Sequence, residues 1–144
     1  YIFSKIRIIL FLVLYLPYPI KKILYIFHTA SPEYVIVHDG PPSDNRAQNY
    51  YVKYKDYIKN VASSEIYATW PQETLYANIL AIQSITLNRV YTEWYRNKGK
   101  DFTITSSTAY DQKWMAGRNI FDNISVAVDT IFANYIARPN VTQP

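Results

Sequence analysis

The sequence contains no cysteine and only three glycines among its 144 residues. Without cysteine the chain has no disulfide bond and no thiolate metal site, and its redox compartment is left open. The low glycine content excludes a collagen-like chain, and an apolar fraction of 49% excludes a disordered one. A chain of this length is enough for one domain with a hydrophobic core.

The net positive charge is confined to the N-terminal end of the chain. The formal net charge of +4 is carried by Lys5, Arg7, Lys21 and Lys22, the only charged residues before Glu33. From Glu33 onward, eleven basic side chains balance eleven acidic ones. A nucleic-acid-binding domain carries its basic excess on the folded part, where it releases counterions from phosphates. We therefore expect no nucleic-acid partner.

Metal-ligating residue types are also scarce. The two histidines, His28 and His38, lie ten residues apart, and no cluster of further ligands accompanies them. A protein zinc site needs three or four such ligands. We expect no metal and no cofactor.

Residues 1–32 form a hydrophobic segment that we set apart from the fold. An unbroken apolar run, Ile8–Leu16, follows Lys5 and Arg7, which is typical of an export signal. The run is shorter than the roughly 20 apolar residues that a membrane-spanning helix needs. The alternatives are a signal or anchor and a mistranslated leader, since the chain begins with Tyr1. Membrane contact is expected only through this segment.

The remaining sequence predicts a single α+β domain in which a long central helix packs against short strands. β-branched and aromatic residues alternate in the predicted strands, and apolar residues recur at helical spacing in the predicted helices. The expected strands are 34–38, 49–52 and 102–105, and the expected helices are 54–65, about 68–97 and 123–136.

The long helix has clear start and stop signals. Thr69 and Gln72 are spaced as a capping box, and Gly99 follows a predicted end near Asn97. Its apolar residues fall on two sides, which is typical of a helix that is covered on both. The polar residues that interrupt these stripes therefore need internal partners: Asn78, Gln83 and Arg89.

Glu65 occupies an unusual position in the helix before it. At 100° per residue around the helix axis, its side chain falls in the middle of an apolar stripe formed by Tyr54, Ile58, Val61 and Ala62. Burial of an ionised carboxylate is costly unless it is paired or lines a cleft. Burial also favours the neutral form and raises the pKa, so that such a group can act as an acid and then as a base.

Other roles of acidic residues remain open at this stage. Glu65 can instead form an ion pair inside the fold, for example with Arg89. Glu73 lies in the first turn of the long helix, where a negative charge compensates the helix dipole.

Several motifs resemble one known family. Residues 57–65 (YIKNVASSE) place a glutamate behind apolar residues, and Trp70-Pro71 follows closely. The next helix carries a Glu-x-Leu-x-Ala pattern, and a Ser/Thr-rich loop, 106–112 (SSTAYDQ), ends in glutamine. Gly117 and an Ala-Val pair at 127–128 complete the series. In this order, over residues 34–138, these motifs resemble the stage II sporulation protein D (SpoIID) and amidase-enhancer (LytB) domain family.

The resemblance implies a bacterial cell-wall domain, which we assign to residues 33–144. Members cleave, or assist the cleavage of, peptidoglycan glycan strands stripped of their peptides, which implies an extracytoplasmic or cell-wall location. It also implies that Glu65 is the catalytic acid of a lytic transglycosylase. The family continues past this C-terminus into a Gly-rich segment, so we expect the domain here to be its N-terminal part.

The candidate substrate-binding residues lie in the loop after residue 105 and in the long helix. Polar and aromatic side chains together suit sugar binding, through hydrogen bonds and ring stacking. The alternative is a turn that aromatic residues anchor to the core. One candidate, Gln83, departs from the family, which usually has an Arg-Thr pair where this chain has Gln83-Ser84. The candidates are Tyr110, Asp111, Gln112, Trp114 and Gln83.

Three functional hypotheses follow. The first is a lytic transglycosylase that uses one glutamate. The second is a binding module that recruits or stimulates a cell-wall amidase, and the departure at Gln83 favours it. The third is an inert remnant that does not fold independently.

Overall fold

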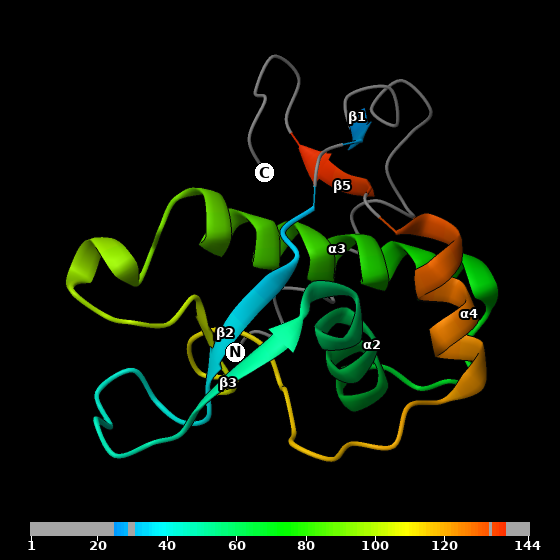
Figure 1. Ribbon diagram of the computed structural model, residues 1–144. Coiled ribbons are helices and arrows are strands. Elements are labelled where there is room, and N and C mark those ends of the chain that lie inside the picture. Colours follow the sequence, from blue (N-terminus) through cyan, green and yellow to red (C-terminus); the bar gives the residue numbers. More distant parts are fainter. Residues whose placement is uncertain (1–24, 29–30, 133, 138–144) are drawn as a thin grey trace.

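The computed structural model describes residues 25–28, 31–132 and 134–137. As predicted, these residues form an α+β fold around a long helix, α3 (Gln72–Tyr91). In Figure 1, α3 crosses the middle of the molecule. On one side lie α2 (Tyr54–Glu65) and the hairpin of β2 (Tyr34–His38) and β3 (Asn49–Lys53), and on the other lies the ribbon of β1 (Tyr25–His28) and β5 (Asn134–Ala137). The two-sided apolar pattern of the long helix is explained by this central position.

A three-stranded sheet lies beside α2. Its central strand β2 (Tyr34–His38) pairs antiparallel with β3 (Asn49–Lys53) and parallel with β4 (Ile104–Thr105). The predicted strand at 102–105 is therefore confirmed only in its second half. At Thr103 the side chain enters the pairing, because the Ile36 N–H donates to the Thr103 hydroxyl oxygen at 3.2 Å. That bond interrupts the regular backbone ladder.

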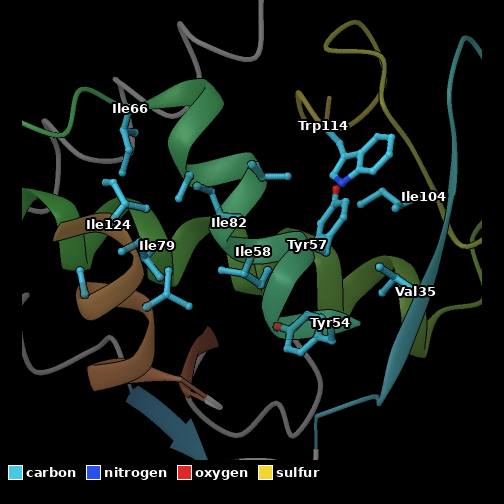
Figure 2. Close-up of a cluster of buried hydrophobic side chains, with 14 of the residues drawn as sticks. Val35, Tyr54, Tyr57, Ile58, Ile66, Ile79, Ile82, Ile104, Trp114 and Ile124 are labelled. Carbon is cyan, nitrogen blue, oxygen red and sulfur yellow. The ribbon is translucent and has the colours of Figure 1, made fainter. Parts of the chain in front are cut away.

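The helix α2 (Tyr54–Glu65) has the predicted bounds, and its predicted stripe is buried. Trp114 and residues of α3, α4 and the sheet pack against this stripe in one hydrophobic core (Figure 2). Its largest fully buried apolar members come from five elements: Val35, Tyr54, Tyr57, Ile58, Ile79, Ile82, Leu87, Ile104 and Ile124. The core thus joins α2, α3 and α4 (Asp122–Ile131) to the sheet.

The ends of α3 differ from the prediction. Its N-cap residue is Pro71, without a side-chain hydrogen bond, so the capping box between Thr69 and Gln72 does not form. The Gln72 amide instead donates to the Tyr76 hydroxyl one turn further on. At the other end the helix stops at Tyr91, because Glu93 adopts a positive φ of 48°.

The chain then continues in a short 3-10 helix, η2 (Arg96–Lys98). Gly99, with φ of 74°, ends η2 in the left-handed conformation that glycine adopts without strain. The stop signal at Gly99 is therefore real, but it ends a separate short helix rather than α3.

The last helix, α4 (Asp122–Ile131), is also shorter than the predicted 123–136. Residues Asn134–Ala137 form strand β5 instead, which pairs antiparallel with β1 (Tyr25–His28). β1 belongs to the hydrophobic segment that we set apart from the fold. Apolar content alone does not separate a strand from a helix over so few residues.

The rest of the N-terminal segment, including the apolar run Ile8–Leu16, lies outside the described residues. Among the helices that the structure describes, none combines the length and apolar character needed to cross a bilayer.

Candidate functional site

Glu65 is the last residue of α2 and is partly buried. Its Oε1 accepts a hydrogen bond of 2.7 Å from the backbone N–H of Lys113. Within the described part of the chain, its Oε2 has no hydrogen-bond partner, and the carboxylate forms no ion pair. One oxygen is therefore fixed by the backbone, while the other is left for a proton or a ligand.

The helix end explains this placement. Ile66, the C-cap residue, turns into an extended conformation while its N–H donates to Ala62 O at 3.1 Å. Its side chain is buried in the core. Glu65 thus lies where the apolar stripe of α2 reaches the edge of the core, next to the loop of residues 106–121.

The environment keeps the carboxyl largely neutral at mildly acidic pH. Burial raises the pKa of Glu65 from 4.5 to about 7, although the N–H bond and the positive charge of Lys113 lower it. Near neutral pH the group therefore exists in both protonation states. A group with this pKa can donate and accept a proton at comparable cost.

The alternative pairing of Glu65 with Arg89 is wrong. Arg89 Nε lies 2.6 Å from Asp111 Oδ1, and this ion pair is buried on its acidic side. The other carboxylate oxygen, Oδ2, accepts bonds from the Tyr95 hydroxyl at 2.6 Å and from the N–H and hydroxyl of Thr105 at 2.9 and 2.8 Å. Asp111 thereby joins the loop to α3, to β4 and to the turn before η2.

Gln112 anchors the same loop to the two central helices. Its Oε1 accepts a 3.1 Å bond from the Tyr57 hydroxyl of α2 and lies 2.8 Å from the Thr86 hydroxyl oxygen of α3. Its Nε2 donates to Ile82 O at 3.1 Å. Because the next residue is Lys113, these bonds also fix the position of the N–H that holds Glu65.

The sugar-binding role predicted for four of the five candidate residues does not fit their burial. Asp111 and Gln112 are 1% and 0% exposed and spend their polar atoms on internal partners. Trp114 is 7% exposed, and its ring packs against Tyr50 with 5.1 Å between centroids. The alternative of a loop anchored to the core therefore accounts for these three residues.

Gln83 is also fully buried, inside α3, and its amide donates to Ile131 O at 3.4 Å. This bond connects α3 to the end of α4. Tyr110 remains accessible, with 48% of its surface exposed. It is the one predicted substrate-binding residue that a sugar can reach directly.

Sequence reasoning missed Asn60 and Ser63, which hold the loop along α2. The Asn60 side chain bonds both the C=O and the N–H of Met115, at 2.8 and 3.0 Å. The Ser63 hydroxyl oxygen accepts a 3.4 Å bond from the Phe121 N–H, and the Ser63 C=O accepts a 2.5 Å bond from the Arg118 guanidinium. Both residues are buried polar groups beside an apolar stripe, which is a signal for an internal partner.

Aromatic side chains also lie on the chain just after Glu65. Tyr67 is 71% exposed, and its ring lies 5.6 Å from that of Trp70. Trp70 in turn borders a surface hollow between the start of α3 and α4. This hollow is lined by Trp70, Gln72, Leu75, Asn123, Val126 and Ala127. The surface beyond the end of α2 thus offers flat rings of the kind on which sugars stack.

No group of three or more His, Cys, Asp or Glu side chains within the described ranges is placed to hold a metal ion.

Comparison with known proteins supports the resemblance in the motifs. The family model described as Stage II sporulation protein (SpoIID) matches residues 44–132, which is more than half of the chain. The match includes α2 with Glu65, all of α3 and the loop that carries Lys113. No curated protein and no solved structure matches the chain. The chain therefore belongs to the stage II sporulation protein family, and its function is related to sporulation or the cell wall.

Proposed function

We propose that the chain acts on peptide-stripped glycan strands of peptidoglycan as a lytic transglycosylase, with Glu65 as its catalytic acid and base. The observation that carries the proposal is a carboxyl group with one oxygen held by Lys113 N–H, the other unpartnered among the described residues, and a pKa of about 7. The backbone hydrogen bond and the raised pKa distinguish Glu65 from an ordinary surface glutamate.

The chemistry needs one such group. Protonated Glu65 donates its proton to the glycosidic oxygen as the bond from that oxygen to the anomeric carbon breaks. The C6 hydroxyl of the same muramic acid then attacks the anomeric carbon, and its proton goes to the Glu65 carboxylate. A 1,6-anhydro ring forms, and Glu65 regains its starting state. Most glycosidases use a second carboxylate for water or the covalent intermediate, and here the sugar's own hydroxyl replaces it.

The N–H of Lys113 orients the acid for this role. Because it occupies Oε1, the proton of the neutral carboxyl resides on Oε2, the oxygen without a partner within the described residues. Hydrogen bonding to a fixed backbone donor also limits the rotation of the carboxyl group. The substrate lies outside the cytoplasmic membrane, so we propose an extracytoplasmic location.

The test is Glu65→Gln in the full chain, compared with wild type and with Glu73→Gln as a matched control. Glu73 is an exposed residue in the first turn of α3 and carries the same chemical change. Release of anhydromuramyl ends from peptide-free strands is followed by mass spectrometry. Loss of a general acid lowers the rate by about 10²–10⁴-fold, and the control should retain wild-type activity. Undiminished release by Glu65→Gln would overturn the proposal.

A second candidate is a non-catalytic module that recruits or stimulates a cell-wall amidase. It is favoured by the buried, uncharged Gln83 at a position where the family usually has arginine. The same assay separates the two candidates. Strand binding by the wild-type chain without any product supports the module, whereas product formation by the purified chain excludes it as the sole function.

A further inference from the structure

The three-stranded sheet has a second face that is turned away from the main core. Val35 and Val37 of β2 belong to that core. Successive side chains of a strand point to opposite faces, so the alternate residues of β2 and their partners in β3 form the second face. These are Ile36 with Tyr51 and His38 with Asn49.

The loop that holds Glu65 lies against the first face. Trp114 belongs to that loop, and its ring packs against Tyr50 with 5.1 Å between centroids. Tyr50 lies between Asn49 and Tyr51 in β3, so its side chain points to the other side of the sheet from theirs. The second face is therefore a different surface from the one beside Glu65.

A polar hollow opens on this second face. It has a volume of ≈ 640 Å³, within the range of roughly 300–1,000 Å³ that small-molecule sites occupy. Its two charged residues, Lys100 and Asp101, have opposite signs. Three side-chain amides add both donors and acceptors: Asn45, Gln48 and Asn49. Hydrogen-bonding groups without a net charge suit an uncharged ligand that carries several hydroxyls.

His38 lines the same hollow and has a hydrogen-bond acceptor to spare. Its side chain is 4% exposed and stacks on Phe102 with 4.3 Å between centroids. Asn49 Nδ2 donates to Asp101 Oδ1 at 3.1 Å, which leaves Asn49 Oδ1 to accept from His38 Nδ1–H at 2.7 Å. In the neutral ring Nε2 is then an acceptor, and this buried atom has no partner within the described residues. Since buried polar groups are normally hydrogen-bonded, Nε2 needs a donor from outside the chain.

An exposed aromatic ring lies beside these polar groups. Tyr51 is 75% exposed, the largest fraction of any bulky hydrophobic side chain in the described ranges. It follows Asn49 by two positions in the edge strand β3, so the two side chains share a face about 7 Å apart. A flat exposed ring next to hydrogen-bonding side chains is the combination that binds a sugar ring.

We propose that the second face of the sheet binds an uncharged sugar unit of a glycan, with Tyr51 stacking on the ring and His38 Nε2 accepting a hydrogen bond from a hydroxyl. The binding involves no bond cleavage and is separate from Glu65. Only the choice of polymer rests on the proposed function. In a peptide-free strand of peptidoglycan the uncharged unit is N-acetylglucosamine, so this face holds the chain on the strand through that sugar.

The probe is chitotetraose, a β-1,4-linked tetramer of N-acetylglucosamine. It contains no muramic acid, so the reaction proposed for Glu65 does not consume it. Its affinity for the full chain is measured by isothermal titration calorimetry. We expect Glu65→Gln to bind it as tightly as wild type. Added salt should leave the affinity unchanged, because the ligand carries no charge.

The matched variants are Tyr51→Ala and Tyr67→Ala. Both remove one exposed tyrosine, at 75% and 71% exposure, and Tyr67 lies two positions after Glu65. We expect Tyr51→Ala to weaken binding by roughly three- to ten-fold and Tyr67→Ala to leave it unchanged. Tyr51→Phe keeps the ring and should retain the affinity.

A second variant tests the histidine. His38→Asn keeps a donor for Asn49 Oδ1 and removes Nε2, so it should also weaken binding, and a thermal melt checks that the fold is retained. Tyr51 is a surface residue, so Tyr51→Ala decides the proposal even if His38→Asn does not fold.

Three results would overturn the proposal: no binding of chitotetraose by wild type, equal binding by wild type and Tyr51→Ala, or a loss in Tyr67→Ala alone, which would place the sugar near Glu65. Each of these leaves the proposed function intact if Glu65→Gln still abolishes the release of anhydromuramyl ends. Conversely, binding that depends on Tyr51, together with undiminished release by Glu65→Gln, would support this surface and refute the proposed function.

Discussion

The stability of the fold should depend on pH through Glu65, and Glu65→Gln isolates that dependence. The pKa of this carboxyl in the folded chain is about 7, against 4.5 for an unperturbed one. Between these two values the folded state binds a proton that the unfolded state has lost. The fold therefore loses stability as the pH rises through this window, and the loss is complete above about pH 7.

The magnitude follows from the two pKa values. At 1.36 kcal/mol per pH unit, the difference between 4.5 and about 7 corresponds to a loss of about 3 kcal/mol. Because Glu65 is partly exposed, solvent screens some of this, and we expect about 1–2 kcal/mol. The glutamine side chain does not ionise, so the variant lacks this loss of stability over the same range. Relative to wild type it should become more stable by that amount between pH 4.5 and 8.

Urea unfolding of both proteins at several pH values measures the difference directly. The comparison cancels every titrating group that the two proteins share, and Glu73→Gln serves as the exposed control. A difference that does not change between pH 4.5 and 8 would show that the carboxyl is not desolvated. A difference of the opposite sign would show that a cation stabilises the ionised form. Either result would refute the argument for Glu65 as an acid.

Two further predictions concern the loop and the rate. Asp111→Asn leaves the Arg89 charge without its buried partner and should lower the free energy of unfolding, measured in urea, by about 3 kcal/mol. The control Asp129→Asn removes only exposed ion pairs with Lys55 and Lys59 and should lower it by under about 1 kcal/mol. Similar losses in the two variants would contradict the anchoring role of Asp111. The kcat/KM for strand cleavage should decline as the pH rises above about 7, because Glu65 then loses its proton. Lys113→Ala should move this decline to higher pH, because the lysine charge lowers the pKa of Glu65. A pH profile of kcat/KM that does not move in this variant would contradict the effect of Lys113 on Glu65.

Local patterns were enough to predict much of this chain. The motifs indicated the family, the strand and helix periodicities gave β2, β3 and α2, and the bearing of Glu65 on an apolar stripe predicted its burial and raised pKa. These properties depend on residues that are near each other in the chain. In a helix or a strand, regularly spaced apolar residues lie on one face of the element, and that face packs against the core.

The ends of the long elements were harder to predict. α3 stops at Tyr91 because Glu93 adopts a positive φ, and α4 gives way to β5 because that segment pairs with β1, more than 100 residues earlier in the chain. Neither choice is visible in hydrophobic periodicity. Both depend on contacts that exist only in the folded chain.

The composition of the site was decided by the tertiary structure. Sequence reasoning took Asp111 and Gln112 for sugar-binding residues because they lie in a polar loop between Tyr110 and Trp114, but the fold turns both inward onto α2, α3 and β4. It also brings the N–H of Lys113 to Glu65 across 48 positions of sequence. A single sequence specifies which groups need partners, whereas only packing in three dimensions determines which partners they find, because hydrogen bonds form between neighbours in space.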